Sequence, residues 1–123
     1  MVIAITGSYG KTSTKEYLST ILSDHMLTLK TEASKNSPIG IAEIILKKLK
    51  PEHKVFVVEM GAYKLGEIRA MCRIVRPQIG IILAINPQHQ DLFGTIETTM
   101  KAKYELVENL TGKNIVIVNY DDI

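Results

Sequence analysis

Near its N-terminus the chain reads Ile3-Ala4-Ile5-Thr6-Gly7-Ser8-Tyr9-Gly10-Lys11-Thr12-Ser13-Thr14: an apolar strand, a glycine turn, and a Gly-Lys-Thr that opens a helix. This order is typical of a phosphate-binding loop, whose glycines let backbone N–H groups point at a phosphate while the helix N-terminus adds partial positive charge. The pattern predicts that Lys11 contacts the β- and γ-phosphates and that the Thr12 hydroxyl binds Mg²⁺. The general Gly-x-x-x-x-Gly-Lys pattern is met only in part, because Ile5 stands where it has a small residue. The alternative is a Gly-Lys-Thr in an ordinary surface turn.

Length and composition describe an ordinary globular domain. The 123 residues suit one domain with a core of its own, with 46% hydrophobic and 23% charged residues. A net charge of +2 is too small to argue for nucleic acid or an anionic membrane surface as a partner. No apolar run approaches the ~20 residues of a membrane span, so membrane insertion is not expected. The single cysteine, Cys72, excludes an internal disulfide and fits a reducing compartment, so we expect the cytoplasm.

Apolar runs alternate with helix-length segments along the whole chain. The runs that predict strands are Val2–Thr6, Met26–Lys30, Val55–Glu59, Ile79–Ile85 and Asn114–Asn119. The segments that predict helices are Thr12–Ser23, Pro38–Lys50, Lys64–Val75 and Ile96–Leu110. Four of the strands are almost continuously apolar, as expected for parallel strands covered on both faces, whereas Met26–Lys30 alternates and suits an edge strand or a strand covered on one face. The alternation predicts a doubly wound α/β fold, similar to that of P-loop NTPases, with a mainly parallel sheet of about five strands and flanking helices.

Several polar side chains follow the predicted strands directly. In doubly wound folds ligands bind outside the carboxyl ends of the strands, so the loop after Thr6, Glu59, and Asn86 with His89 are expected at one edge of the sheet. Glu59 is a candidate Mg²⁺ ligand, because this ion takes one or two carboxylates together with phosphate oxygens and water. A salt bridge to a nearby lysine or arginine, or a helix N-terminal carboxylate, is the alternative. His89 is a candidate metal ligand or phosphate contact.

Lys103 lies within an apolar stripe of a predicted helix. The residues that recur with it at helical spacing are Ile96, Met100, Val107 and Leu110. Such a lysine either buries its stem and extends its amine to water, or turns inward to the site. Periodicity does not choose between the two.

Taken together, these motifs resemble the central ATP-binding domain of the Mur ligases, the ligases of peptidoglycan precursors, and within them the MurF branch. The matching stretches are Ile5–Glu16, Asn36–Gly40, Val57–Ala62 with Gly66-Glu67-Ile68, Asn86–His89, Phe93–Thr95, Ala102–Glu105 and Asn119–Asp122. They cover most of the chain in the order and spacing of the family. Tyr9 and Ser37 depart from it, since each stands where the family often has Asn, and this affects substrate recognition.

The resemblance implies roles for individual residues. The loop that would hold the ATP phosphates consists of Gly7, Ser8, Tyr9, Gly10, Lys11, Thr12 and Ser13. Thr12 and Glu59 would bind one Mg²⁺ and His89 would help bind a second. Lys103 matches a lysine that is carbamylated in several family members, where the carbamate supports that second metal. Asn86 would lie near the nucleotide, and Asn36 and Ser37 near the substrate, so the implied catalytic set is Lys11, His89 and Lys103.

The resemblance also implies a reaction and a domain plan. A substrate carboxylate attacks the γ-phosphate to give an acyl phosphate, from which an amine displaces phosphate to form an amide. In the MurF branch these substrates are a UDP-N-acetylmuramoyl-peptide and D-alanyl-D-alanine. We expect residues 1–123 to be a central domain truncated near its C-terminal end, without the UDP-sugar and C-terminal domains, and inactive alone. Two alternatives are a non-catalytic nucleotide-binding or assembly module and a folylpolyglutamate- or cyanophycin-type ligase.

Overall fold

Five strands and four helices make up the described part of the fold. The structure, a computed structural model, describes residues 1–32, 35–62, 64–84, 96–112 and 114–119, with backbone alone for 96–99. The strands are β1 (Val2–Thr6), β2 (Thr28–Lys30), β3 (Val55–Glu59), β4 (Ile79–Ile82) and β5 (Ile115–Val118). The helices are α1 (Lys11–Ser23), α2 (Pro38–Lys48), α3 (Glu67–Val75) and α5 (Ile96–Glu108).

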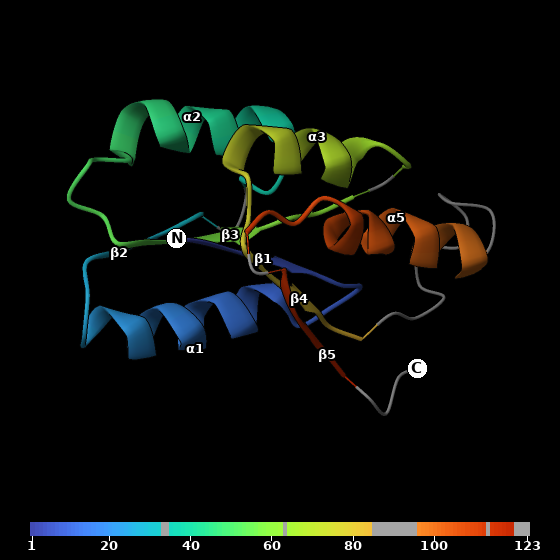
Figure 1. Cartoon of the computed structure of the whole chain (residues 1–123), viewed down its shortest axis with the longest axis horizontal. Coiled ribbons are helices and arrows are strands. Elements are labelled where there is room, and N and C mark those ends of the chain that lie inside the picture. Colours follow the sequence, from blue (N-terminus) through green and yellow to red (C-terminus); the bar gives the residue numbers. More distant parts are fainter. Residues whose placement is uncertain (33–34, 63, 85–95, 113, 120–123) are drawn as a thin grey trace.

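The strands form one parallel sheet in the order β2-β3-β1-β4-β5 (Figure 1). The central strand β1 lies between β3 and β4, and the chain crosses over to either side of it. Near its carboxyl end Ile5 is in register with Glu59 of β3, and Thr6 with Ile82 of β4. Three strands therefore end side by side at one edge, where a doubly wound sheet binds its ligands.

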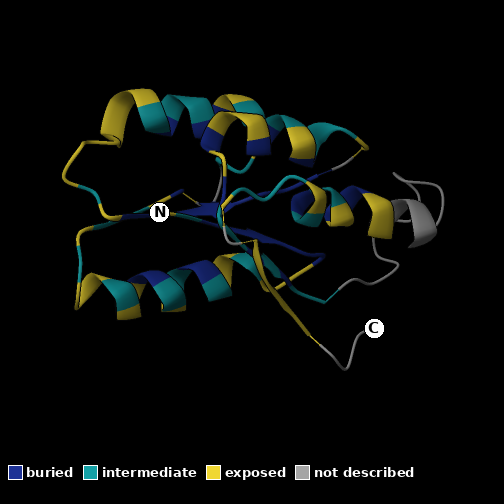
Figure 2. Ribbon diagram, viewed as in Figure 1, coloured by how far each residue is buried: buried dark blue, intermediate teal, exposed yellow. Residues whose placement is uncertain are grey.

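Helices cover both faces of the sheet, with α1 on one face and α2, α3 and α5 on the other (Figure 1). Successive residues of a strand point to opposite faces, so Ile3 and Ile5 pack with Leu18 and Leu22 on the α1 side, while Ala4 joins the core of the other side. The central strands are buried and the outer surfaces of the helices are exposed (Figure 2). The predicted doubly wound α/β fold and its parallel sheet are confirmed.

Element boundaries differ from prediction by a few residues. The edge position predicted for the second strand is confirmed, although β2 begins at Thr28 rather than at Met26. The third helix begins at Glu67 rather than at Lys64, because Gly66 precedes it in the left-handed conformation. None of the helices in the described ranges is both long and apolar enough to cross a lipid bilayer.

The expectation that the last strand is covered on both faces is wrong. All four side chains of β5 are exposed, although each is Ile or Val. The physical reason is position: β5 is the outermost strand beside β4, whereas α1 packs on β1, β2 and β3, and α5 packs on β1 and β4. Apolar composition alone predicted burial, and burial depends on what lies next to the strand.

Candidate nucleotide and metal site

The loop after β1 is held tightly against the end of β4. The Leu83 N–H donates to Thr6 O and the Ser8 N–H to Ala84 O, each at 2.8 Å. A Cβ at Gly7 would lie 2.8 Å from Leu83 Cβ, and the φ of Gly7 is 150°, so this position requires glycine. Gly10, with a φ of 87°, turns the chain directly into α1. The glycines that predicted a phosphate-binding loop thus make the turn and the close approach that such a loop needs.

Lys11 lies over this loop at the start of α1. Its Nζ donates a hydrogen bond to Gly7 O at 3.0 Å. Burial lowers the pKa of Lys11, and the nearby Glu59 carboxylate partly opposes that effect. Among the described residues no side chain caps α1 and no acidic residue lies in its first turn, so the helix N-terminus keeps its attraction for an anion.

Glu59 sits at the end of β3, facing α1, and is only 2% exposed. Thr12 Oγ1 donates to Glu59 Oε1 at 3.1 Å, and Lys15 Nζ lies 3.2 Å from the same oxygen. The backbone N–H of Glu59 donates to Thr31 Oγ1 at 3.0 Å, which fixes the strand end. The hydroxyl and carboxylate expected to share a cation are thus adjacent, and the salt bridge considered as the alternative is present too.

These donors suit a hard cation that is also held by phosphate. Carboxylate and hydroxyl oxygens are ligands of Mg²⁺, which keeps several waters and uses few protein groups when it accompanies a nucleotide. Within the described ranges no group of three His, Cys, Asp or Glu side chains comes together. A cage made by the protein alone is therefore not found there, and the Thr12–Glu59 pair fits a metal that arrives with phosphates.

Lys103 is turned inward, with its side chain only 2% exposed. The reading in which its amine reaches water is therefore wrong. Burial, and secondly the Lys11 charge, lower its pKa to about 8, while Glu67 opposes the shift. The predicted stripe needs a correction, because Met100 is 49% exposed and the fully buried neighbours on α5 are Ala102 and Leu106. Helical spacing alone therefore did not predict which residues of α5 are buried.

Glu105 fixes the helix that carries Lys103. One of its carboxylate oxygens accepts from the Gly66 N–H at 2.8 Å and the other from the Arg69 N–H at 3.1 Å. These amides belong to the first turn of α3, which lacks a cap of its own. A carboxylate of α5 thus caps α3, and the position of Lys103 depends on that contact between helices.

Two of the other predicted site residues, Asn36 and Ser37, lie within the described part of the chain. The backbone O of Asn36 accepts from the Gly61 N–H at 2.9 Å, and a Cβ at Gly61 would lie 2.8 Å from Asn36 Nδ2, so Asn36 packs against the segment after Glu59. Ser37 caps α2 by accepting from the Gly40 N–H at 3.2 Å. Asn86 and His89 fall outside the described residues.

Comparison with known proteins identifies the family. The family model described as the Mur ligase middle domain matches residues 5–123. The chain belongs to this family. Its relatives include the UDP-N-acetylmuramoyl-tripeptide–D-alanyl-D-alanine ligases of Escherichia coli K12, 37% identical over 121 residues, and of Buchnera aphidicola, 40% identical over 120 residues. Each alignment covers 98% of this chain and 26% of the relative, so the chain spans about a quarter of their length.

Solved structures agree with this assignment to the Mur ligases. The MurF ligase from Thermotoga maritima in complex with ADP matches with a TM-score of 0.94 and 33% identity, over 99% of this chain and 28% of that one. A crystal structure of MurF from Acinetobacter baumannii matches with a TM-score of 0.90 and 39% identity, over 95% and 26%. The arrangement of strands and helices is therefore that of MurF structures.

Sequence reasoning gave no role to Lys15, Thr31 or Glu105 of this Mur ligase domain. For Lys15 a signal was available: Leu18 and Leu22 follow it by three and seven residues, which places it on the inward stripe of α1. The same argument was applied to Lys103. Thr31 and Glu105 act through contacts between distant segments, which periodicity does not report.

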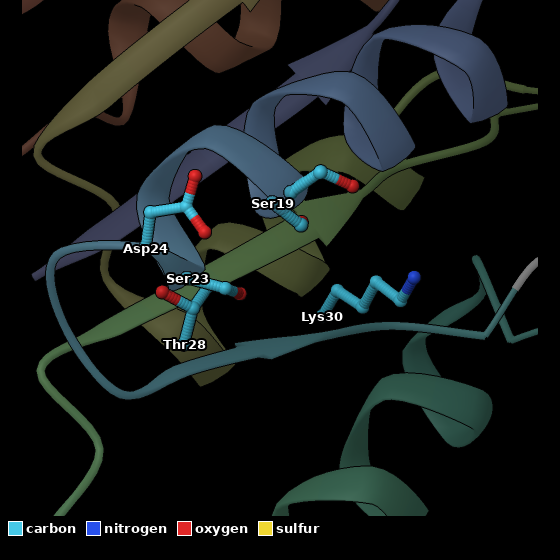
Figure 3. Close-up of a pocket in the computed structure, with 6 residues that line it drawn as sticks. Ser19, Ser23, Asp24, Thr28 and Lys30 are labelled. Carbon is cyan, nitrogen blue, oxygen red and sulfur yellow. The ribbon is translucent and has the colours of Figure 1, made fainter.

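A hollow of about 300 Å³ lies elsewhere on the Mur ligase domain, between the C-terminal half of α1 and β2. Figure 3 shows Ser19, Ser23 and Asp24 of this region with Thr28 and Lys30 on the neighbouring strand. None of the predicted site residues lines it. The phosphate-binding loop thus belongs to a different place in the fold.

Proposed function

We propose that this chain is the ATP-binding middle domain of a MurF-type ligase and holds Mg-ATP at the carboxyl edge of its sheet. The observation that carries the proposal is the convergence there of the glycine loop, the Thr12–Glu59 pair and the buried Lys103. Similarity to a MurF ligase solved with ADP supports the choice of nucleotide. In the proposed whole enzyme, further domains bind the other substrates, because the relatives are about four times as long.

Each part of the edge has a proposed role toward the nucleotide. The Lys11 ammonium and backbone N–H groups of the loop from Gly7 to Ser13 hold the phosphates, because α1 begins there with an uncapped N-terminus. The Ser8 N–H is an exception, since it donates to Ala84 O. Thr12 Oγ1 and the Glu59 carboxylate hold Mg²⁺. This ion, when bound, supplies positive charge to the phosphoryl group during transfer. Asn86 contacts the nucleotide and Asn36 and Ser37 lie toward the substrate.

Lys103 is proposed to act as a carbamate that, with His89, supports a second Mg²⁺. Carbamate formation needs the neutral amine, and a pKa of about 8 makes that form available near neutral pH. The position also suits the product, since Lys11 lies close enough to repel the ammonium and would attract the anion. Incubation with ¹³C-bicarbonate should give a carbamate resonance in NMR that is missing in Lys103→Met.

The proposed reaction is the one for which the relatives are named, the ligation of D-alanyl-D-alanine to UDP-N-acetylmuramoyl-tripeptide. A carboxylate of UDP-N-acetylmuramoyl-tripeptide attacks the γ-phosphate, which gives an acyl phosphate and ADP. The amine of D-alanyl-D-alanine then displaces phosphate and forms the amide. We propose a cytoplasmic location for this reaction, because a free thiol such as that of Cys72 fits a reducing compartment. The domain proposed here supplies the phosphate and metal site of that reaction and is inactive alone.

Binding of Mg-ATP to the isolated chain tests the proposal. Calorimetry, or chemical-shift changes of the loop amides, should detect Mg-ATP and Mg-ADP at millimolar concentration. Lys11→Ala should abolish both signals, whereas Lys47→Ala at the far end of α2 should leave them intact. A chain that folds but responds to neither nucleotide would contradict the proposed function.

A further inference from the structure

We propose that Lys15 is a positioning residue for the metal site: it holds the Glu59 carboxylate in place for the cation that accompanies the nucleotide. The inference rests on the proposed function, because it concerns how that site is organised. It gives a role to a buried charge that the reaction itself does not use.

Lys15 is unusual among the lysines of the chain because its side chain is fully buried, with 0% exposure. Lysines are almost never fully buried unless they are paired. Its Nζ lies 3.2 Å from Glu59 Oε1 and 3.9 Å from Glu16 Oε1, and Glu16 is 46% exposed. Within the described residues Nζ makes no hydrogen bond, so its main interaction is the ion pair with the buried Glu59 carboxylate. A buried cation that faces one carboxylate is best explained by what that carboxylate does.

The geometry leaves one carboxylate oxygen available. Within the described residues both side-chain contacts of Glu59 involve Oε1, which accepts from Thr12 Oγ1 at 3.1 Å and faces Lys15 Nζ at 3.2 Å. Thr12 and Lys15 are three residues apart on α1, so one helix face presents both groups. Because they fix Oε1 from the same side, the carboxylate keeps one orientation and Oε2 remains for a cation.

Lys11 and Lys15 have different electrostatic roles: Lys11 faces the phosphates and Lys15 faces the Glu59 carboxylate. Lys11 lies over the phosphate loop through its contact with Gly7 O and is directed to the phosphates. Once it binds them, it is no longer available to Glu59. Lys15 lies one turn further along α1, beside the carboxylate, and in this proposal it keeps that contact when a nucleotide binds. Such supporting contacts to metal ligands typically change metal affinity by 10- to 100-fold, roughly, when they are removed.

The test measures how much Mg²⁺ tightens ATP binding. Calorimetry gives the dissociation constant of ATP with excess chelator and again with Mg²⁺. The first constant divided by the second reports how much the metal strengthens ATP binding. In Lys15→Met we expect this ratio to fall on the order of tenfold. A general structural defect would raise both dissociation constants by the same factor and leave their ratio unchanged. A ratio that rises would mean that Lys15 competes with the metal, and either result would overturn the inference.

Two further variants make the result specific. Ser19→Ala changes a buried residue on the same side of α1, one turn beyond Lys15, and should leave the ratio as in the wild type. Lys15→Met combined with Glu59→Gln removes both charges of the buried pair and remains informative even if Lys15→Met alone does not fold. This double variant should have the same ratio as Glu59→Gln, and a lower one would overturn the inference, because Lys15 would then act independently of Glu59. If wild-type protein binds no ATP with either buffer, the proposed function itself fails.

Discussion

Replacing Lys103 by Met should remove a rise of stability with pH. The pKa of the buried amine is about 8, against an ordinary value of 10.5. Below pH 8 Lys103 is protonated in both the folded and the unfolded chain, and the cost of burying its charge lowers the free energy of unfolding by its full amount. From about pH 8 to 10.5 the folded state releases the proton while the unfolded state keeps it, so the free energy of unfolding increases with pH. The difference between the two pKa values corresponds to about 3 kcal/mol.

The assay compares urea unfolding of the wild type and Lys103→Met from about pH 7 to about pH 10.5. Chelator and CO₂-free buffer keep the amine free of metal and unmodified. Subtracting the free energy of unfolding of the variant from that of the wild type removes the contribution of other titrating groups. One of them is Cys72, whose pKa is raised to about 12 by burial, so that it makes stability fall as the pH rises. We expect the difference to change by about 3 kcal/mol over this range. Lys101→Met, on an exposed side of the same helix, should follow the wild type.

Two results would refute this reasoning. Parallel curves for the wild type and Lys103→Met would mean that the amine reaches water and is not buried as described. A wild type that loses stability relative to the variant as the pH rises would mean that the folded state binds the proton more tightly than the unfolded state. In that case an acidic partner, and not burial, would dominate the environment of Lys103.

Three further perturbations test other parts of the fold. Gly7→Ala should lower the free energy of unfolding by about 3 kcal/mol, because Gly7 has a positive φ and an added Cβ would lie 2.8 Å from Leu83. Gly66→Ala, which has open space around it, should lower it by about 1 kcal/mol. Equal losses in urea unfolding would contradict the steric argument. Glu105→Ala should lower that free energy by about 1 to 2 kcal/mol and reduce amide protection in the first turn of α3 in hydrogen exchange; unchanged protection would show that the cap is dispensable. Ile117→Lys should alter stability by less than about 0.5 kcal/mol and reduce self-association in sedimentation experiments, because β5 is an exposed edge; a large loss of stability would mean that the strand is covered.

The sequence predicted the layers of this fold because burial in a parallel sheet leaves a direct trace in composition. Val55–Glu59 is apolar up to its last residue, and it is indeed buried along its whole length between two layers of helices. Ile115–Val118 carries the same trace, yet it is exposed, because composition does not say where a strand lies in the sheet. The order of strands depends on crossovers between distant segments, which local patterns do not encode.

The site was predictable where chemistry and position coincide. Glu59 stood out because a carboxylate at the end of a buried strand needs a partner, and the structure places it beside Thr12. The motif predicts no role for Lys15, which directly follows it, although its side chain is fully buried. A buried lysine is informative for the same reason as a buried glutamate: removing either charge from water is costly, so its neighbours reveal what offsets that cost.

The charges at the sheet edge form an arrangement that a nucleotide completes. Lys11 is half-buried there and Lys15 and Lys103 are buried, whereas only Glu59 is buried among the carboxylates described near them, Glu59, Glu67 and Glu16. Among the described residues the buried cations thus outnumber the buried carboxylates, and repulsion from Lys11 is one reason why the Lys103 pKa is low. Phosphate oxygens would offset this excess, so Mg-ATP binding should stabilise the fold most strongly when all three amines are charged. A carbamate on Lys103 reverses the balance, because an anion then replaces a cation, and the same edge would favour an additional divalent ion. In the proposed function, the number of metals at the site thus depends on whether Lys103 is an ammonium or a carbamate.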